Sequence, residues 1–485
     1  MIDKKSAYRA LTSRDARFDG VFYVGVTSTG IYCRPICPVK PPLQKNCLFF
    51  DSAEAAEKAA FRPCLRCRPE LAPGNAPVDS SHRIADLLIR RIEEGLTEDV
   101  ASLEEIAAQF SLSSRQLRRI VQKELGVSPL ELRQTRRLLL AKQLLTETML
   151  SVTDVAYASG FASLRRFNEV FHRQYRMPPS RLRKEAREPG HWIGSDTSTL
   201  LLSYRPPFNW DALLAFLRLR AIKGVESVDE TGYARTVRLG EHTGWVRVTQ
   251  AAGRHGLSVE FTHSLTPVLP LLLRRLRSLF DLDAHPEIIA AHLEQDPLLQ
   301  SSLNRDAGLR VPGAFDGFEM VVRAVLGQQI TVKAATTIGG RFAHAFGEPF
   351  QTPFPELTHL SPVAAKVALA SLDDVASLGI VSARSRTLLA VAEACVTGDL
   401  RLDAGMHPEE AIASLVTLPG IGDWTAHYIA MRALRWPDAF PAGDIVVRKN
   451  LGGITAKEAE QRSQAWRPWR SYAVMHIWKN LTPEH

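Results

Sequence analysis

Apolar and polar residues recur with a helical period along most of the C-terminal half, most clearly around residue 420. A helix predicted over Pro408–Val416 ends at the sequence LPGIG (418–422), and a second helix is predicted to begin at Asp423. Two glycines two positions apart, Gly420 and Gly422, allow a tight turn that leaves N–H groups pointing outward at a helix N-terminus, where a phosphate can bind. An ordinary pair of helices joined by a glycine turn fits this segment equally well.

Alternating apolar and polar residues predict strands in two other regions. Residues 20–32 are typical of a strand, a turn and a second strand. A small antiparallel sheet is predicted from four segments, at 200–204, 236–239, 244–249 and 257–261. Helices at 213–221 and 268–280 are expected to pack on this sheet, and from Pro286 onward the pattern is helical throughout. We therefore expect a small α+β domain followed by an all-α domain.

Between these regions, residues 82–188 predict a series of short helices. Segment 102–110 begins with a capping-box pattern, Ser102 with Glu105, and a short turn and a basic helix follow it. The same order recurs at 151–167, and a long helix over 129–145 joins the two copies. Helix, turn and basic second helix are the parts of a helix-turn-helix, although a small basic helical bundle is the alternative. The candidates for contact with a DNA groove are Arg115, Gln116, Arg118 and Arg165, whereas Leu117, Ile120, Leu164 and Phe167 are expected in the core.

Length and charge indicate several domains and a polyanionic partner. At 485 residues the chain is too long for one core, and three or four domains are expected. Residues 1–190 contain 31 Lys and Arg against 22 Asp and Glu, whereas the remainder contains 29 against 30, so the excess of +8 lies in the N-terminal part. An ordinary solvated surface can also have a small excess of positive charge, but a basic N-terminal half favours nucleic acid as the binding partner. No long apolar run and no apolar signal segment are present, which predicts a cytoplasmic protein without a membrane partner.

Five of the six cysteines lie between residues 33 and 67. Cys33 and Cys37 form one close pair, and after 26 intervening residues Cys64 and Cys67 form another. In a reducing compartment this clustering favours a metal over disulfides, and four thiolates suit a closed tetrahedral Zn²⁺ site. From the spacing alone a purely structural zinc site is the simpler interpretation. Cys47 has no partner and is expected to be a small buried residue.

The segments FYVGVTSTGIYCRPIC (22–37) and FRPCLRC (61–67) resemble the N-terminal domain of the Ada methylation-sensor family. The resemblance implies that Cys33 is both a zinc ligand and the acceptor of a methyl group from a methylphosphotriester, and that methylation raises DNA affinity. It also implies phosphate contacts at Thr29, Lys40 and Arg62. Lysine at position 40 keeps the charge of the family's arginine but loses its bidentate fork. The tandem helix-turn-helix resembles the AraC family, which implies transcription activation and RNA polymerase as a partner.

The hairpin followed by Gly443-Asp444 resembles the helix-hairpin-helix, Gly/Pro-Asp superfamily of DNA glycosylases. The resemblance implies that Asp444 is the catalytic carboxylate, although an N-cap role is compatible with the same position. Trp424 stands where the bifunctional lyases of the superfamily have a lysine nucleophile, which predicts a monofunctional enzyme. No cysteine follows Cys395, so the iron–sulfur loop of some members is not expected.

Segments 206–210, 318–328 and 467–472 are similar to AlkA-type glycosylases. The resemblance implies base flipping into an aromatic pocket that attracts a cationic alkylated purine. The pocket residues it implies are Trp424, Tyr428, Trp469 and Phe216, and the DNA contacts are Gly420, Gly422, Gln328 and Gln329. Gln329 takes the place of the family's apolar wedge, which makes the wedge assignment less direct. A monovalent cation at the hairpin is a further implication.

Together these patterns predict a mainly α, multidomain fold. Its parts are an Ada-like zinc domain (1–75), an AraC-type double helix-turn-helix (80–188), a TBP-like α+β domain (197–283) and a helix-hairpin-helix glycosylase domain (284–485). We expect a monomeric adaptive-response protein that excises purines of the 3-methyladenine and 7-methylguanine type and regulates transcription. Two alternatives remain. One is a regulator with an inactive glycosylase module, and the other is an active enzyme whose N-terminal half only tethers it to DNA. No Pro-Cys-His-Arg motif is present, so repair of O-alkylguanine is not expected.

Overall fold

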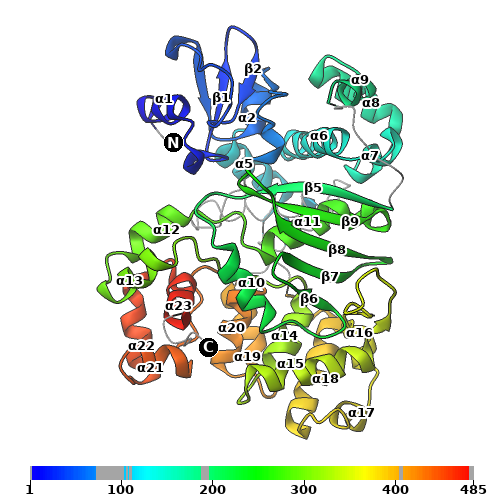
Figure 1. The fold of residues 1–485 in the computed structure, drawn as a ribbon, viewed down its shortest axis with the longest axis vertical. Coiled ribbons are helices and arrows are strands. Elements are labelled where there is room, and N and C mark those ends of the chain that lie inside the picture. Colours follow the sequence, from blue (N-terminus) through cyan, green and yellow to red (C-terminus); the bar gives the residue numbers. More distant parts are fainter. Residues whose placement is uncertain are drawn as a thin grey trace. The chain divides into compact units, whose positions relative to one another are not determined.

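The structure is a computed structural model that describes residues 3–72, 103–104, 107–108, 112–186, 196–402 and 408–479 (Figure 1). The chain forms two compact units, one of residues 1–206 and 251–274 and the other of residues 207–250 and 275–485. Within the described ranges, no helix is both long enough and apolar enough to cross a membrane. The capping pair predicted at Ser102 and Glu105 lies outside the described residues.

The first unit begins with a small module built on a four-stranded sheet. The strands are β1 (Tyr23–Val26), β2 (Ile31–Cys33), β3 (Cys47–Phe50) and β4 (Arg62–Pro63), in the order β3-β1-β2-β4. β1 pairs antiparallel with β2 and β3, and β4 runs parallel to β2. The strand, turn and strand predicted at 20–32 are therefore confirmed. Helices α1 (Lys4–Ser13) and α2 (Ala53–Lys58) complete the module.

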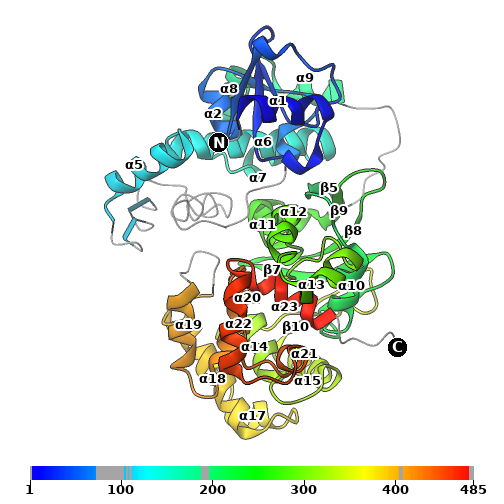
Figure 2. The same ribbon diagram turned by 90° about the vertical axis from the view of Figure 1, so that its left-hand side faces the viewer.

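The helical part of this unit is centred on the long helix α6 (Pro129–Glu147), which begins with a capping box between Ser128 and Glu131. The other helices are α5 (Ser114–Leu125), α7 (Val152–Ala158), α8 (Leu164–Tyr175) and α9 (Pro179–Ala186). Of the four residues predicted in the core, Leu117 and Phe167 are fully buried, whereas Ile120 and Leu164 are only partly buried. Both views show α6 against the N-terminal module (Figures 1 and 2), and Thr135 Oγ1 on α6 donates to Glu57 Oε2 on α2 at 2.7 Å.

The predicted antiparallel strands all form. In the first unit β5 (Thr197–Ser203) pairs antiparallel with β9 (Gly256–Thr262), and in the second unit β6 (Glu226–Val228), β7 (Gly232–Leu239) and β8 (His242–Gln250) pair in sequence order. The short strand β6 was not predicted from the sequence. The two helices predicted beside the sheet are α10 (Trp210–Arg218) and α11 (Leu269–Leu279).

The second unit is otherwise helical, with one exception. Its helices are α12 (Pro286–Leu293), α13 (Pro297–Arg305), α14 (Gly317–Leu326), α15 (Val332–Phe346), α16 (Ala364–Ala368), α17 (Leu372–Ala376), α18 (Ser382–Thr397), α19 (Pro408–Val416), α20 (Asp423–Arg432), α21 (Ile445–Asn450), α22 (Ala456–Ser463) and α23 (Arg470–Lys479). The expectation of helix throughout is wrong at β10 (Glu348–Pro349) and β11 (His359–Leu360), which pair antiparallel. The prolines of the segment EPFQTPFPE (348–356) prevent a continuous helix there.

Two apolar cores organise these helices, and α20 contributes to both. Ala430 and Met431 belong to a core that includes residues of α12, α13 and α23. Ala426 and Ile429 belong to a second core that includes residues of α14, α15 and α18. The predicted hairpin is formed by α19 and α20, with the bounds that the sequence indicated. Because α20 joins both cores, side chains on its first turns have a fixed position between them.

Candidate active site and metal centre

Asp444 lies at the N-cap of α21, and three neutral donors hold its carboxylate. Oδ1 accepts a hydrogen bond from the Val447 backbone N–H at 2.9 Å and from the Trp478 indole Nε1 at 3.1 Å. Oδ2 accepts from the Trp424 indole Nε1 at 3.1 Å. The residue is only 9% exposed, so the carboxylate is largely removed from solvent. The N-cap position suggested by the sequence is confirmed.

The two indoles that donate to this carboxylate both contact the ring of Tyr428. The rings of Trp424 and Tyr428, one helical turn apart on α20, stack with centroids 5.5 Å apart and an interplanar angle of 6°. The ring of Trp478 meets that of Tyr428 edge-on, with centroids 6.2 Å apart. Sequence reasoning did not identify Trp478. It lies on α23, and no local pattern relates it to Asp444, which is 34 positions earlier in the chain.

Two arginine side chains contact Tyr428 and the nearby Phe216. Arg432 Nη1 donates to Tyr428 Oη at 2.9 Å. Burial alone would raise the pKa of Tyr428, but the charges of Arg432 and Arg220 outweigh burial and lower this pKa below its ordinary value. The guanidinium carbons of Arg220 and Arg432 lie 3.8 and 4.9 Å from the centroid of the Phe216 ring. The aromatic surface predicted to attract a cationic base therefore already contacts two cations.

Trp469 lies in one of the two apolar cores of the second unit. Trp469 is 3% exposed and packs in the core, with its ring centroid 5.8 Å from that of Tyr472. Of the four predicted pocket residues, Trp424 and Tyr428 lie together beside Asp444 and Phe216 contacts the arginines next to Tyr428. Phe216 and Trp478 pack against the same apolar core as Trp469, and the pocket role of Trp469 stays a prediction.

The hairpin turn is shaped by its glycines and tied to the end of α14. Gly420 has a φ of +82°, and a Cβ there would lie 2.2 Å from Thr387 Oγ1, so a larger residue would displace the turn. Gly422 is exposed and caps α20 without a side-chain hydrogen bond. Gln328 Nε2 donates to Gly420 O at 2.9 Å and to Thr425 Oγ1 at 3.1 Å. Its neighbour Gln329 is exposed and has a φ of +55°, an uncommon and strained conformation for glutamine.

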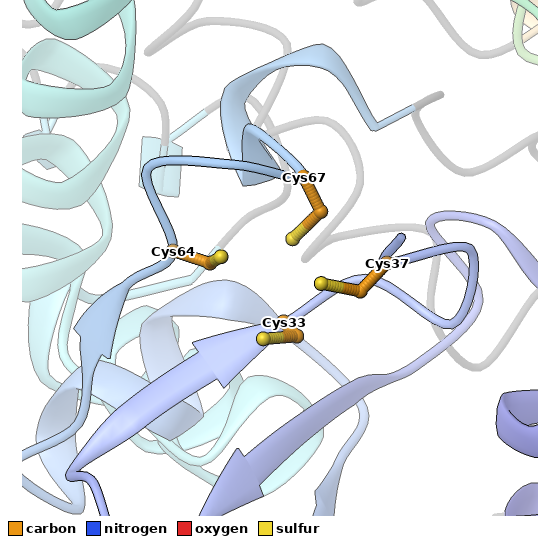
Figure 3. Close-up of side chains that lie close together, drawn as sticks. All are labelled: Cys33, Cys37, Cys64 and Cys67. Atoms are coloured by element: carbon orange, nitrogen blue, oxygen red, sulfur yellow. The ribbon is translucent and has the colours of Figure 1, made fainter. Parts of the chain in front are cut away.

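The four clustered cysteines of the N-terminal module lie close together in space. Figure 3 shows their sulfur atoms directed toward one another from the end of β2, the segment after β4 and two loops. All four Sγ atoms lie within 4.8 Å of one another. Zinc–sulfur bonds of about 2.3 Å place tetrahedral sulfurs roughly 3.8 Å apart, so this donor set fits Zn²⁺. The Cys33 thiol is partly exposed, whereas Cys37, Cys64 and Cys67 are buried.

Backbone N–H groups and a buried ion pair hold the cysteine loops. The N–H of Arg34 donates to Cys67 Sγ at 3.3 Å, and the N–H of Arg66 donates to Cys64 Sγ at 3.4 Å. The Arg34 guanidinium donates to Cys67 O at 3.1 Å and forms a buried ion pair with Asp19. Such N–H···S contacts favour a thiolate, the form that binds a metal. Arg34 and Asp19 were not identified from the sequence, since only the folded chain brings them together.

The predicted phosphate and groove residues are accessible. Thr29 and Lys40 are exposed, and Arg62 is half-buried, with its N–H donating to Gly30 O at 2.9 Å in the β1–β2 turn. Arg115, Gln116, Arg118 and Arg165 are exposed on α5 and α8. Gln116 Oε1 also accepts from the Ser113 N–H at 2.8 Å, as part of the capping box of α5, so its side chain has a structural contact of its own.

Four family descriptions match consecutive parts of the chain. They are the metal-binding domain of Ada (residues 6–70), a helix-turn-helix domain (106–185), the AlkA N-terminal domain (199–316) and the HhH-GPD superfamily of base excision DNA repair proteins (322–470). Fold and site together therefore define a base excision repair protein joined to a metal-binding, DNA-binding regulator.

Comparison with whole proteins gives the family. The chain is 38% identical over 488 residues to the probable bifunctional transcriptional activator/DNA repair enzyme AlkA of Mycobacterium tuberculosis, covering 99% of this chain and 97% of the relative. The chain belongs to this family of bifunctional transcriptional activator/DNA repair enzymes.

Shorter relatives each match one part of the chain. DNA-3-methyladenine glycosylase 2 of Escherichia coli is 35% identical and is covered to 95%, by 57% of this chain. The bifunctional activator/repair enzyme Ada of E. coli is 36% identical over 25% of this chain and 33% of its own length. The solved 3-methyladenine DNA glycosylase of Archaeoglobus fulgidus has a TM-score of 0.51 at 19% identity, over 57% of this chain and 97% of that protein, which shows a shared fold.

Proposed function

We propose that the chain removes alkylated purines from DNA by hydrolysing the N-glycosidic bond, with Asp444 as the catalytic carboxylate. The observation that carries the proposal is the Asp444 carboxylate itself, which is 9% exposed and accepts hydrogen bonds from the indoles of Trp424 and Trp478, whose rings both contact Tyr428. A buried negative charge beside aromatic rings suits a reaction in which a purine leaves and positive charge develops on the sugar. The name of the E. coli relative, DNA-3-methyladenine glycosylase 2, supports the substrate class.

The residues would act in sequence on a nucleotide that has been flipped out of the duplex. Alkylation at N3 or N7 makes the purine a good leaving group, so the bond to the sugar breaks with little need for a general acid. Asp444 would stabilise the cationic sugar and orient the attacking water. Trp424, in the first turn of α20, matches the position of the lysine nucleophile in the bifunctional lyases that the hairpin resembles. Water would therefore be the nucleophile, and the enzyme would be monofunctional. The DNA strand then stays intact.

Gel analysis of alkylated duplex DNA tests the monofunctional assignment. After incubation with the wild-type protein, free methylated purine should appear in solution, while strand breaks should appear only when the abasic product is treated with alkali. Breaks that form without alkali, together with a covalent protein–DNA adduct trapped by borohydride, would contradict water as the nucleophile.

We also propose that Cys33 accepts a methyl group. In this step the Cys33 sulfur forms a bond to the methyl carbon of a methylphosphotriester, the carbon–oxygen bond breaks, and the phosphodiester leaves as an anion. Cys33 is the partly exposed member of the four, and no backbone N–H donor to its sulfur is present in the described part of the chain. Cys33, Cys37, Cys64 and Cys67 would hold Zn²⁺, which when bound keeps the thiolates deprotonated at neutral pH. Thr29, Lys40 and Arg62 would contact the neighbouring phosphates.

Mass spectrometry of the protein after exposure to methylphosphotriester DNA tests this step. One methyl group should be found on Cys33, and Cys33→Ser should acquire none. Cys47→Ser changes a buried thiol outside the cluster and should be methylated like the wild type. Methylation of another cysteine in the wild-type protein would contradict the assignment.

We also propose the domain boundaries given above, at residues 75, 188 and 283. The proposed partners are promoter DNA and RNA polymerase. A monomeric state and a cytoplasmic location complete the proposal. A monovalent cation at the hairpin is also proposed. The carbonyl oxygen of Gly420 in this hairpin already accepts a hydrogen bond from Gln328 Nε2, so a cation there would bind beside that hydrogen bond. A regulator with an inactive glycosylase module remains the second candidate. It would bind alkylated DNA without releasing any base.

A further inference from the structure

The hydrogen bonds at Asp444 differ in kind from those at most buried carboxylates of this chain. Asp438 is bonded to Arg467 and Arg470, and Glu319 to Arg235 and Arg323. At Asp444, by contrast, the described residues provide two indole N–H groups and one backbone N–H, and no Lys, Arg or His within ion-pairing distance. A cation would orient a carboxylate but would also cancel its charge. Neutral donors orient the group and leave its full negative charge in place.

The two indoles are themselves fixed, and by different elements. Trp424 lies in the first turn of α20 and stacks on Tyr428, whose hydroxyl accepts from Arg432. Trp478 is in the last turn of α23, and Asn450 Nδ2 on α21 donates to Ile477 O beside it at 2.7 Å. The helix that begins at Asp444 is thus tied to the helix that carries Trp478. A carboxylate held from three sides in this way has little rotational freedom about its Cβ–Cγ bond.

We propose that Trp424 and Trp478 are positioning residues whose indole N–H groups fix the orientation of the Asp444 carboxylate while leaving its charge uncancelled. This inference rests on the proposed glycosylase function and specifies how its carboxylate is held. The two acceptor positions of Oδ1 are both used, by Val447 and Trp478, whereas Oδ2 uses one, for Trp424. The remaining acceptor position of Oδ2 is the place for the attacking water.

Replacement of single atoms separates this role from that of an aromatic wall. 3-Benzothienylalanine has the shape and π-face of tryptophan but carries sulfur in place of the N–H. 5-Fluorotryptophan keeps the N–H but has a less electron-rich ring. Each is introduced singly at Trp424 or Trp478 in the full-length, zinc-loaded protein. The single-turnover rate of base release is then measured on a duplex with one 7-methylguanine, and the Kd on a duplex with a tetrahydrofuran abasic analogue.

We expect benzothienylalanine at either position to lower the single-turnover rate by about 10- to 100-fold, with the Kd unchanged within about two-fold, because one hydrogen bond to a charged group is lost. 5-Fluorotryptophan should keep the rate within about three-fold of the wild type, since the bond is retained. The matched control is Trp466, whose indole donates to Asp296 Oδ2 at 2.8 Å; benzothienylalanine there should change neither quantity.

The opposite pattern overturns the proposal: if fluorotryptophan lowers the rate and benzothienylalanine does not, the rings act through their faces. Equal losses from both analogues, or a loss at Trp466 as large as at Trp424, would show a general packing effect and would overturn it as well. Failure of the proposed function is a separate result, because the wild-type protein would then release no base in the same assay.

Discussion

Asp444 and Cys33 both stand at an end of a regular element, and in each case neighbours from distant parts of the sequence set their surroundings. Asp444 caps α21 and receives indole N–H groups from α20 and α23. Cys33 ends β2, and Cys64 follows β4, which pairs with β2. Local sequence could therefore identify these residues as candidates for a functional site, but the tertiary fold determines which groups contact them.

The arginines beside Phe216 give a prediction about substrate preference. Arg220→Gln removes the guanidinium that lies 3.8 Å from the Phe216 ring. If this ring borders the base pocket, removing one positive charge favours a cationic lesion over a neutral one, and the ratio of kcat/KM for 7-methylguanine over hypoxanthine should rise about 3- to 10-fold. Arg218→Gln, an exposed change two positions earlier at the end of α10, should leave the ratio unchanged. An unchanged ratio in Arg220→Gln would place Phe216 outside the pocket.

Part of the site could be predicted from local pattern alone. Glycine spacing, an N-cap position and an i, i+4 aromatic pair identify the hairpin, Asp444, Trp424 and Tyr428, because all of these depend on nearby residues. Trp478 could not be predicted, since its place beside Asp444 depends on how α23 packs. The same limit applies to Trp469, which the structure places in the core. The contact of Arg432 with Tyr428 has an i, i+4 spacing on α20, a local signal that was not used in the prediction.

At the scale of the elements, helix α23 carries both Trp478 and a buried histidine. His476 is 4% exposed, and its Nδ1 lies 2.9 Å from Ser302 Oγ on α13. Burial lowers the pKa of His476 to about 4; Asp306 opposes this effect and Arg305 adds to it. In the unfolded chain the histidine takes up a proton near pH 6.5. The neutral side chain therefore stabilises the fold above that pH, and this contribution is lost as the pH falls toward 4.

We expect the urea midpoint, followed by tryptophan fluorescence, to fall more steeply between pH 7 and pH 5 in the wild type than in His476→Gln. The full contribution is on the order of 2–3 kcal/mol, of which about half or more should be lost by pH 5. His344→Gln, at an exposed position, should retain the wild-type slope. Parallel pH curves for wild type and His476→Gln would contradict the assigned direction.

A buried lysine on α6 helps to hold this helix against the cysteine module, in addition to the Thr135–Glu57 hydrogen bond and the Arg136–Glu54 ion pair. Lys142 is 1% exposed, and its Nζ donates to Cys64 O at 2.8 Å and to Glu70 Oε2 at 2.5 Å. Lys142→Met should destabilise this unit by about 3 kcal/mol, because a buried carboxylate loses one of its cations. It should also speed release of Zn²⁺ to a chelator, since the backbone of a ligand loses its support.

Lys58→Met is the matched control for thermal melting and metal release. Lys58 Nζ donates to Gly126 O at 2.7 Å, but this hydrogen bond is exposed, and removing it should cost about 0.5 kcal/mol or less. If both variants release metal at the wild-type rate, α6 does not support the cysteine cluster.

Helices and strands with a regular spacing of apolar residues could be predicted from the sequence, and very short elements could not. The hairpin helices, the long helix of the regulator half and the four main strands follow from spacing of apolar residues. β6 has three residues, and β10 and β11 have two each, which is too short for an alternating pattern to appear. These strands form because the surrounding chain brings their backbones together.

At the scale of the whole molecule, the basic excess lies in the N-terminal 190 residues, whereas the candidate catalytic carboxylate lies in the second unit. The binding constant for promoter DNA should fall as the salt concentration rises. Arg115→Ala and Arg165→Ala should each make the plot of the logarithm of this constant against the logarithm of the salt concentration less steep, by about one for each phosphate that the protein no longer neutralises. The maximal rate of base release at saturating protein should stay within about two-fold of the wild type. A parallel fall in that rate would show that the two activities cannot be separated.

The most direct measurement is the single-turnover release of 7-methylguanine from duplex DNA by the wild-type protein and by Asp444→Asn. Asparagine is also a good N-cap, so α21 should still form and DNA binding should persist. We predict that the wild type frees the base and leaves the strand uncut, while Asp444→Asn is slower by about 10²- to 10³-fold or more at unchanged Kd. Equal rates for the two proteins, or no release by the wild type, would contradict Asp444 as the catalytic carboxylate.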